Sequence, residues 1–289
     1  MSQRLGRKLI GGTDLDVSPL GFGTVKFGRD QGVKYPEHFT IPDDRKMVNL
    51  LTLAHELGMN LLDTAPAYGV SEDRLGQLFR KHKGLREQWV ICSKVGEEFV
   101  TLEGGQCESY FDFSEPHIRF SVERSLKRLN TDVIELMLVH SNGDDVNIIE
   151  QTGCLDVLTD LKKEGKILAS GMSTKTVEGG ILALKHSDVV MVTYNLSEQG
   201  EKPVLDYALE REKGVLIKKA FASGHACLSG KDPVLECMKL VFSHPAVSST
   251  IVGTINPVHM QQNVEACLKT FRHDVLTCPA STFVDYPDC

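Results

Sequence analysis

Short apolar runs and longer amphipathic segments alternate along the whole chain. The short runs are rich in β-branched residues, and the longer ones carry apolar residues at helical spacing. Strands are predicted at residues 18–24, 60–65, 89–94, 133–140, 167–174, 188–195, 215–220 and 248–253, and helices at 43–58, 71–82, 115–129, 155–166, 176–186, 202–214, 232–244 and 257–271. Eight strand–helix units in succession predict an α/β fold with a parallel sheet.

Two architectures accommodate such units, a closed (β/α)8 TIM barrel and a doubly wound open sheet. The open sheet requires a glycine-rich phosphate loop after an early strand. The segment GFGT at 21–24 is a single G-x-G, which is a weak match, and the chain has no Walker-type GK[ST]. The pattern therefore favours one barrel domain spanning 1–289. Residues 9–17 predict a small N-terminal β-hairpin, with Gly11 and Gly12 available for its turn.

Composition and charge argue against nucleic acid, metal ions and a membrane as partners. The chain has 289 residues and a net charge of −7, which gives no reason to expect a nucleic-acid partner. Its eight cysteines form no C-x-x-C pair and have no zinc spacing with histidine, so we expect no metal site and a reducing, cytoplasmic location. No apolar run is long enough to predict a membrane span.

Polar side chains follow three consecutive predicted strands. Asp63 ends the second strand and Tyr68 follows in its loop, Lys94 ends the third strand, and His140 ends the fourth. Each residue alone has a structural interpretation as a turn cap, a rim side chain or a loop histidine. Together they would meet at the carboxyl-terminal mouth of the barrel. An ammonium beside a phenol lowers the phenol's pKa, so the set is suited to proton transfer as a carbonyl becomes an alkoxide.

The sequence resembles the aldo-keto reductase superfamily over nearly its whole length. DTAPAYGVSEDRLG at 63–76 closely resembles one family signature, and SVERSLKRLNTDVIELMLVH at 121–140 resembles a second. The resemblance implies a (β/α)8 barrel closed at its base by a hairpin, and NAD(P)H-dependent interconversion of carbonyls and alcohols. It also implies that Tyr68 is the general acid, that Lys94 lowers the pKa of Tyr68, that Asp63 pairs with Lys94, and that His140 aligns the substrate carbonyl.

The resemblance also places the cofactor. Ser173 and Thr174 stand where the family has a Ser-Asn pair for the nicotinamide carboxamide, and Met191 stands where a glutamine is frequent. Since Met cannot donate a hydrogen bond, one hydrogen bond to the carboxamide is expected to be missing or to come from Asn195 instead. Lys218 stands near the usual aromatic stacking position, where it could bind phosphate or serve as a rim charge. The other residues expected at the cofactor are Thr24, Lys219, Ala220, Gly253, Thr254, His259, Gln262 and Asn263.

Cofactor choice and reaction direction remain open at this point. Gly253 and His259 occupy positions where NADP-preferring members carry Lys and Arg. NADP(H) is therefore expected only from the family resemblance, and NAD(H) is an alternative cofactor. Three functions are compatible: a reductase of aldehydes and ketones, an NAD-dependent aldose (sugar) dehydrogenase, and a non-catalytic cofactor-binding regulatory subunit.

Two segments lie outside the strand–helix pattern. Residues 96–114 predict a long irregular loop, and loops of this length are usually functional. The resemblance implies that this loop covers the substrate mouth. Its aromatic side chains could form an apolar wall or simply pack beneath it: Phe99, Tyr110, Phe111 and Phe113. The C-terminal tail at 272–289 has no assigned role.

Overall fold

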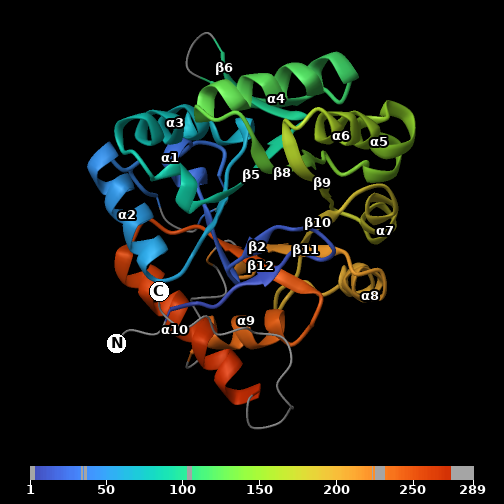
Figure 1. Ribbon diagram of the computed structural model, residues 1–289. Coiled ribbons are helices and arrows are strands. Elements are labelled where there is room, and N and C mark those ends of the chain that lie inside the picture. The colour runs from blue at the N-terminus through green and yellow to red at the C-terminus, as the bar shows by residue number, and fades with distance from the viewer. Residues whose placement is uncertain are drawn as a thin grey trace.

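The structure, a computed structural model, describes residues 4–33, 35, 38–102, 106–222, 224 and 232–274. Eight parallel strands close into a barrel, with β12 paired to β3 (Figure 1). In chain order the barrel strands are β3 (Leu20–Gly23), β4 (Leu61–Asp63), β5 (Val90–Val95), β8 (Ile134–His140), β9 (Ile167–Ser173), β10 (Val189–Thr193), β11 (Gly214–Lys218) and β12 (Val247–Val252). The predicted (β/α)8 barrel is confirmed.

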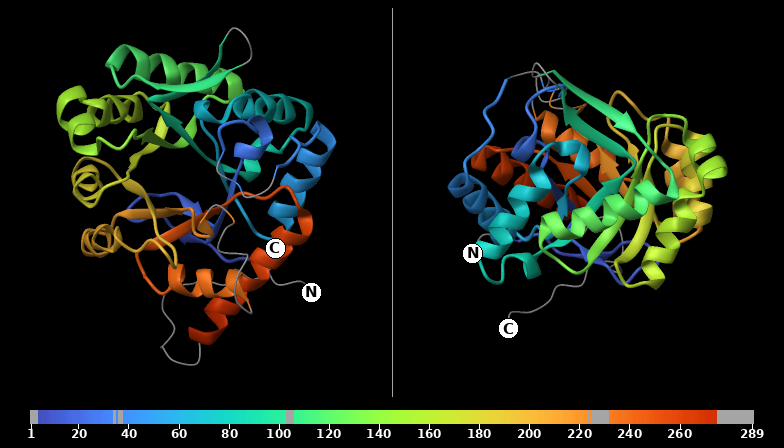
Figure 2. Two further views of the ribbon diagram at one scale, coloured as in Figure 1. Left: turned by 180° about the vertical axis from the view of Figure 1, so that it is seen from behind. Right: turned by 90° about the horizontal axis from the view of Figure 1, so that it is seen from above.

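Helices surround the barrel and follow its strands in chain order (Figures 1 and 2). They are α2 (Asp44–Glu56), α3 (Ser71–Lys81), α4 (Glu115–Leu129), α5 (Asp145–Thr152), α6 (Cys154–Lys163), α7 (Val177–His186), α8 (Lys202–Glu210), α9 (Pro233–Phe242) and α10 (Pro257–Asp274). The predicted boundaries agree to within a few residues. The sequence pattern missed α5 and the short α1 (Val25–Gly28). Within the described ranges, no helix combines the length and apolarity needed to cross a bilayer.

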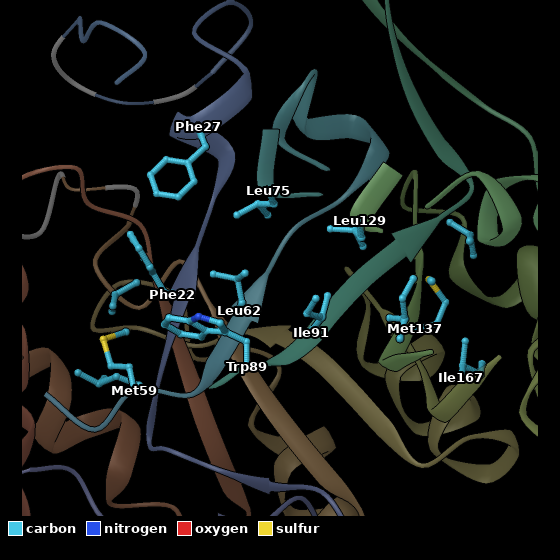
Figure 3. Packing of buried hydrophobic residues seen from close by; sticks show 14 of the residues in the cluster. Phe22, Phe27, Met59, Leu62, Leu75, Trp89, Ile91, Leu129, Met137 and Ile167 are labelled. Carbon is cyan, nitrogen blue, oxygen red and sulfur yellow. The ribbon is translucent and has the colours of Figure 1, made fainter. Parts of the chain in front are cut away.

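The core lies in the layer between strands and helices. Figure 3 shows Leu62, Ile91 and Met137 of three neighbouring strands turned toward Leu75 of α3 and Leu129 of α4. These side chains are fully removed from water. Burial of a large aliphatic side chain contributes about 1.5–3 kcal/mol, so this layer holds the strand ends in fixed positions.

The N-terminal hairpin closes one end of the barrel. Strands β1 (Lys8–Leu9) and β2 (Asp16–Val17) pair antiparallel, and buried Ile10 packs with residues of the barrel interior. The N–H of Gly12 donates to the carbonyl of Glu212 at 2.7 Å, directly before β11. Gly11 has φ +51°, and a Cβ there would lie 2.3 Å from the nitrogen of Gly214. The hairpin therefore rests against the start of β11, and the predicted N-terminal hairpin is confirmed.

A second hairpin replaces the irregular loop that was predicted at 96–114. Strands β6 (Glu97–Thr101) and β7 (Cys107–Phe111) pair antiparallel. This hairpin projects from one end of the barrel, opposite the end closed by the N-terminal hairpin (Figure 2, right). The prediction of a long structureless loop was wrong.

Close packing of α3 on α4 gives a stability prediction. A Cβ at Gly76 would lie 1.8 Å from the carbonyl oxygen of Arg128. Because this neighbour is backbone that cannot swing away, Gly76→Ala is expected to lower the free energy of unfolding by about 1–3 kcal/mol. Urea unfolding followed by circular dichroism measures the change. Gly200→Ala is the control, because a Cβ at Gly200 meets nothing within 4 Å; equal losses in the two variants would contradict the packing argument.

Candidate active site

One carboxylate joins the ammonium and the phenol at the barrel mouth. Lys94 Nζ donates to Asp63 Oδ1 at 2.6 Å and to the carbonyl of Thr64 at 2.9 Å. The hydroxyl of Tyr68 donates to Asp63 Oδ2 at 3.2 Å. The ammonium also lies 4.7 Å from the centroid of the Tyr68 ring. Asp63 ends β4 and Lys94 lies in the neighbouring β5, so strand pairing brings the two charges together.

A tight turn places Tyr68 against this pair. Residues Pro66–Tyr68 form a single 3₁₀ turn directly after β4, and Gly69 follows with φ +64°. A Cβ at Gly69 would lie 2.3 Å from the carbonyl oxygen of Gly28, so the turn needs glycine both for its backbone angle and for its close approach to α1. The phenol is thus held by backbone geometry.

The pKa of Tyr68 differs from the expectation. Burial raises it above its ordinary value, and the charge of Asp63 raises it further. Lys94 acts in the expected direction, but its lowering effect is smaller than these two. For Lys94, burial opposes the charged form, yet Asp63 and Tyr68 more than compensate and hold the pKa above normal. At neutral pH the pair is therefore a protonated phenol beside an ammonium.

His140 completes the predicted set and has a carboxylate partner that was not predicted. The ring ends β8 and meets the ring of Tyr68 edge-on, with centroids 6.4 Å apart. Its Nδ1 lies 2.9 Å from Oε2 of Glu97, the first residue of β6. Burial lowers the pKa of His140, and Lys94 and Lys218 add to that effect, while Glu97 opposes it. The imidazole is therefore neutral at neutral pH.

The four predicted catalytic residues lie at one end of a cavity of about 680 Å³. Ten of the predicted cofactor residues line it: Ser173, Met191, Lys218, Lys219, Ala220, Gly253, Thr254, His259, Gln262 and Asn263. They come from the ends of β9, β10, β11 and β12 and from α10. Among the described residues, no group of three or more His, Cys, Asp or Glu is arranged to hold a metal ion.

Three predicted cofactor residues do not line the cavity. The hydroxyl of Thr24 donates to the carbonyl of Asp63 at 2.9 Å, where it supports the turn. The amide of Asn195 donates to the carbonyl of Lys219 at 3.1 Å and is used within its own loop. Thr174 is fully buried. The amide of Asn195 thus has a partner within its own loop, and its part in binding the carboxamide stays a prediction.

Lys218 is a half-buried cation inside the cavity. Its Nζ donates to Ser173 Oγ at 2.8 Å and to the carbonyl of Thr174 at 2.6 Å. Burial lowers its pKa to about 8, against the opposing charge of Glu201. Both bonds hold the ammonium near the ends of β9 and β11, so it lies within the cavity rather than on the rim.

Of the polar side chains that line the cavity, two were not predicted from the sequence. Lys26 and Tyr35 line the cavity on the side of β3, and Lys26 Nζ lies 4.1 Å from the Tyr35 ring centroid. Lys26 is the third residue after a strand end, a position that could have been searched. Tyr35 is brought in from a segment without regular pattern, which offers no such signal.

The aromatic residues of 96–114 are not among the residues lining the cavity. Phe99 instead packs against the guanidinium of Arg29, 3.8 Å from its ring centroid. Phe111 stacks on Phe113, with centroids 6.1 Å apart. These interactions support the packing alternative for the aromatic side chains.

Comparison with known proteins decides the family. The aldo/keto reductase family model matches residues 19–232. The chain belongs to the aldo/keto reductase family. Those residues include the four side chains at the mouth and the β6–β7 hairpin. Since the members are oxidoreductases, the arrangement of Asp63, Lys94 and Tyr68 is to be interpreted as oxidoreductase chemistry.

Individual relatives differ in the substrates in their names. The Pseudomonas aeruginosa protein PA4992, assigned to the aldo-keto reductases, is 54% identical, with a TM-score of 0.81, over 92% of this chain and 95% of that one. NADH-specific methylglyoxal reductase of Escherichia coli is 30% identical over 70% of this chain and 60% of its own length. L-galactose dehydrogenase of Arabidopsis thaliana is 24% identical over 90% of this chain and 87% of its own. The chain thus resembles both carbonyl reductases and sugar dehydrogenases.

Proposed function

We propose that the protein is an NAD(P)H-dependent oxidoreductase that reduces aldehydes or ketones to alcohols, with Tyr68 as the general acid. The observation that supports this most directly is the carboxylate of Asp63 shared between Lys94 and the Tyr68 hydroxyl at the end of a 680 Å³ cavity. Cys92, Cys154 and Cys267 are free thiols, which suits the reducing cytosol where we place the reaction.

The residues of the cavity fit a dinucleotide. The cavity extends from the mouth residues to the turn between β12 and α10, and its volume is in the range of cofactor sites. Lys218 and Lys219 provide cationic groups suited to phosphate, and Gln262 and Asn263 offer amides at the α10 end. When bound, the nicotinamide supplies the hydride, since no side chain can do so.

The residues at the mouth then control the transfer of one proton from Tyr68 to the substrate oxygen. The raised pKa of Tyr68 keeps its proton in place until an alkoxide, a far stronger base than the phenolate, develops next to it. Lys94 remains charged beside the ring and stabilises the phenolate that is left. Asp63 fixes the ammonium in that position through their 2.6 Å ion pair.

A second candidate is an NAD-dependent sugar dehydrogenase. It is favoured by the pairing of Glu97 with His140, because a carboxylate-supported neutral imidazole is suited to accept a proton from a hydroxyl. The L-galactose dehydrogenase relative is consistent with it. Turnover assays separate the candidates: NADPH and NADH with a panel of aldehydes including methylglyoxal, against NAD and NADP with free aldoses. Absence of turnover in both directions, with cofactor bound, would favour the regulatory-subunit alternative and overturn the proposal.

Cofactor preference is predicted to be modest. Of the α10 residues that line the cavity, His259 is the one titratable side chain, and an imidazole binds a 2′-phosphate less strongly than a guanidinium. The ratio of dissociation constants for NADPH and NADH is expected to stay below about a thousandfold, roughly 4 kcal/mol. Fluorescence titration with both cofactors measures it. His259→Arg should tighten NADPH and leave NADH nearly unchanged; a larger preference in the unaltered protein would reveal another phosphate ligand.

A further inference from the structure

A carboxylate outside the predicted catalytic set faces the catalytic histidine. Glu97 Oε2 lies 2.9 Å from His140 Nδ1, although the two groups are not aligned as a straight hydrogen bond. The side chain of Glu97 is 16% exposed, and that of His140 is 21% exposed. The carboxylate lies on the side of the ring turned away from Nε2, so Nε2 is the nitrogen that remains for a ligand in the cavity.

The β6–β7 hairpin holds Glu97 in place. The next residue, Glu98, is buried and points to the opposite face of β6, where it binds α4. Glu98 Oε1 lies 3.1 Å from His117 Nε2, accepts from Ser121 at 3.3 Å, and pairs with Arg124. One carboxylate therefore anchors the strand while its neighbour is directed at His140.

The charges around the pair fix its protonation. The pKa of Glu97 is lowered to about 2: burial opposes its charge, but His140, Ser109 and Arg29 favour it more strongly. On the other side, His140 faces Lys94 and Lys218, which both disfavour an imidazolium. The result is an ionised carboxylate against one nitrogen of a neutral ring.

We propose that Glu97 is a positioning residue that keeps the single proton of neutral His140 on Nδ1 and so presents the Nε2 lone pair to the cavity. A carboxylate attracts the N–H and repels a lone pair, so the Nδ1–H tautomer is favoured. In that state Nε2 accepts a hydrogen bond and cannot donate one to a carbonyl. Alignment of a carbonyl oxygen by a hydrogen bond from Nε2 would require the imidazolium or the Nε2–H tautomer.

This assignment deepens the sugar dehydrogenase candidate of the proposed function, on which its substrate consequence rests. Nε2 suits a substrate that presents a hydroxyl, such as an alcohol or a sugar. In the oxidation of that hydroxyl the carbon would give its hydride to the oxidised nicotinamide, the O–H bond would break with its electron pair forming the second carbon–oxygen bond, and the proton would move to Nε2. The imidazolium that forms is stabilised by the negative charge of Glu97.

The direct test is ¹⁵N NMR of the histidine ring in the cofactor-free protein. Signals of His140 are identified by their absence in His140→Gln. We expect a pyrrole-type Nδ1 and a pyridine-type Nε2 in the unaltered protein, and a mixture or reversal in Glu97→Gln, with the titration of His140 moved to lower pH. Glu108→Gln removes an exposed carboxylate from the same hairpin and should change neither property. A protonated Nε2 in the unaltered protein, or unchanged signals in Glu97→Gln, would overturn the proposal.

Kinetics form the second arm. Glu97→Gln is expected to lower kcat for alcohol or sugar oxidation at neutral pH about tenfold or more, with the pH profile moved in the acid direction. Glu97→Asp should restore part of the loss, which a purely structural role would not predict. If no substrate turns over in any variant but the NMR signature is present, the proposed function fails while the assignment of Glu97 stands. If turnover is normal but the NMR signals of an Nδ1-protonated His140 are absent, the assignment of Glu97 fails while the proposed function stands.

Discussion

Replacing Tyr68 by Phe is expected to lower kcat for carbonyl reduction by about 10²–10⁴-fold, the usual contribution of a positioned general acid. The change removes one hydroxyl, which donates to Asp63 at 3.2 Å. Asp63 keeps its 2.6 Å bond to Lys94, so the fold and the cavity should persist. The measurement is steady-state turnover, with cofactor affinity determined separately by fluorescence titration and expected to be nearly unaltered.

The cavity contains its own control for this experiment. Tyr35 also lines it, and Tyr35→Phe removes the same atom type from the same space. Because the hydroxyl that shares the Asp63 carboxylate with Lys94 is that of Tyr68, removal of the Tyr35 hydroxyl should leave kcat within a few-fold of the unaltered value. Retained turnover in Tyr68→Phe, or an equal loss in Tyr35→Phe, would show that Tyr68 is not the general acid.

The barrel and the placement of its mouth residues could be predicted because both depend on local pattern. Asp63, Lys94 and His140 each follow an apolar run, and parallel strands bring their carboxyl ends to one face. The N-terminal hairpin was predictable for the same reason, from a short apolar pattern around Gly11 and Gly12. These features need no knowledge of which distant segments pack together.

Features that depend on distant partners were missed. The two adjacent carboxylates of β6 suggest an exposed loop, yet Glu98 is buried because Arg124 of α4 neutralises its charge and His117 lies 3.1 Å from its Oε1. Glu97 is in turn paired with His140. No local pattern reveals either partner, so the hairpin and the positioning role of Glu97 appear only in three dimensions.

The same limit applies inside the site. Residue type makes Asn195 a possible replacement donor, but only the structure shows that its amide donates to the carbonyl of Lys219. The pKa of Tyr68 was expected to fall because Lys94 was considered alone. Burial and the charge of Asp63 reverse the sign, and both depend on packing around the strand end. Residue type indicates what a side chain can do, while its surroundings decide what it does.

Removal of Lys94 should cost stability as well as activity. The side chains of Lys94 and Asp63 are 1% and 3% exposed, so Lys94→Met leaves a buried carboxylate without its ammonium. Breaking a buried ion pair in this way costs about 3–5 kcal/mol. We expect a loss of that size in the free energy of unfolding, measured by urea denaturation at neutral pH. Lys202→Met is the control, because Lys202 and Asp206 form an exposed pair and its loss should cost at most about 1 kcal/mol.

The double variant decides whether the charge is the cause. Asp63→Asn with Lys94→Met removes both charges and keeps a group that can accept from the Tyr68 hydroxyl. If the unpaired carboxylate destabilises the single variant, the double variant should recover most of the lost stability while remaining inactive. A double variant as unstable as Lys94→Met would mean that the aliphatic packing and the 2.9 Å bond of Lys94 to the carbonyl of Thr64 account for the loss. Lys94 and Asp63 would then hold the strand ends together mainly by packing and hydrogen bonding. The charge of Lys94 would matter chiefly for proton transfer from Tyr68.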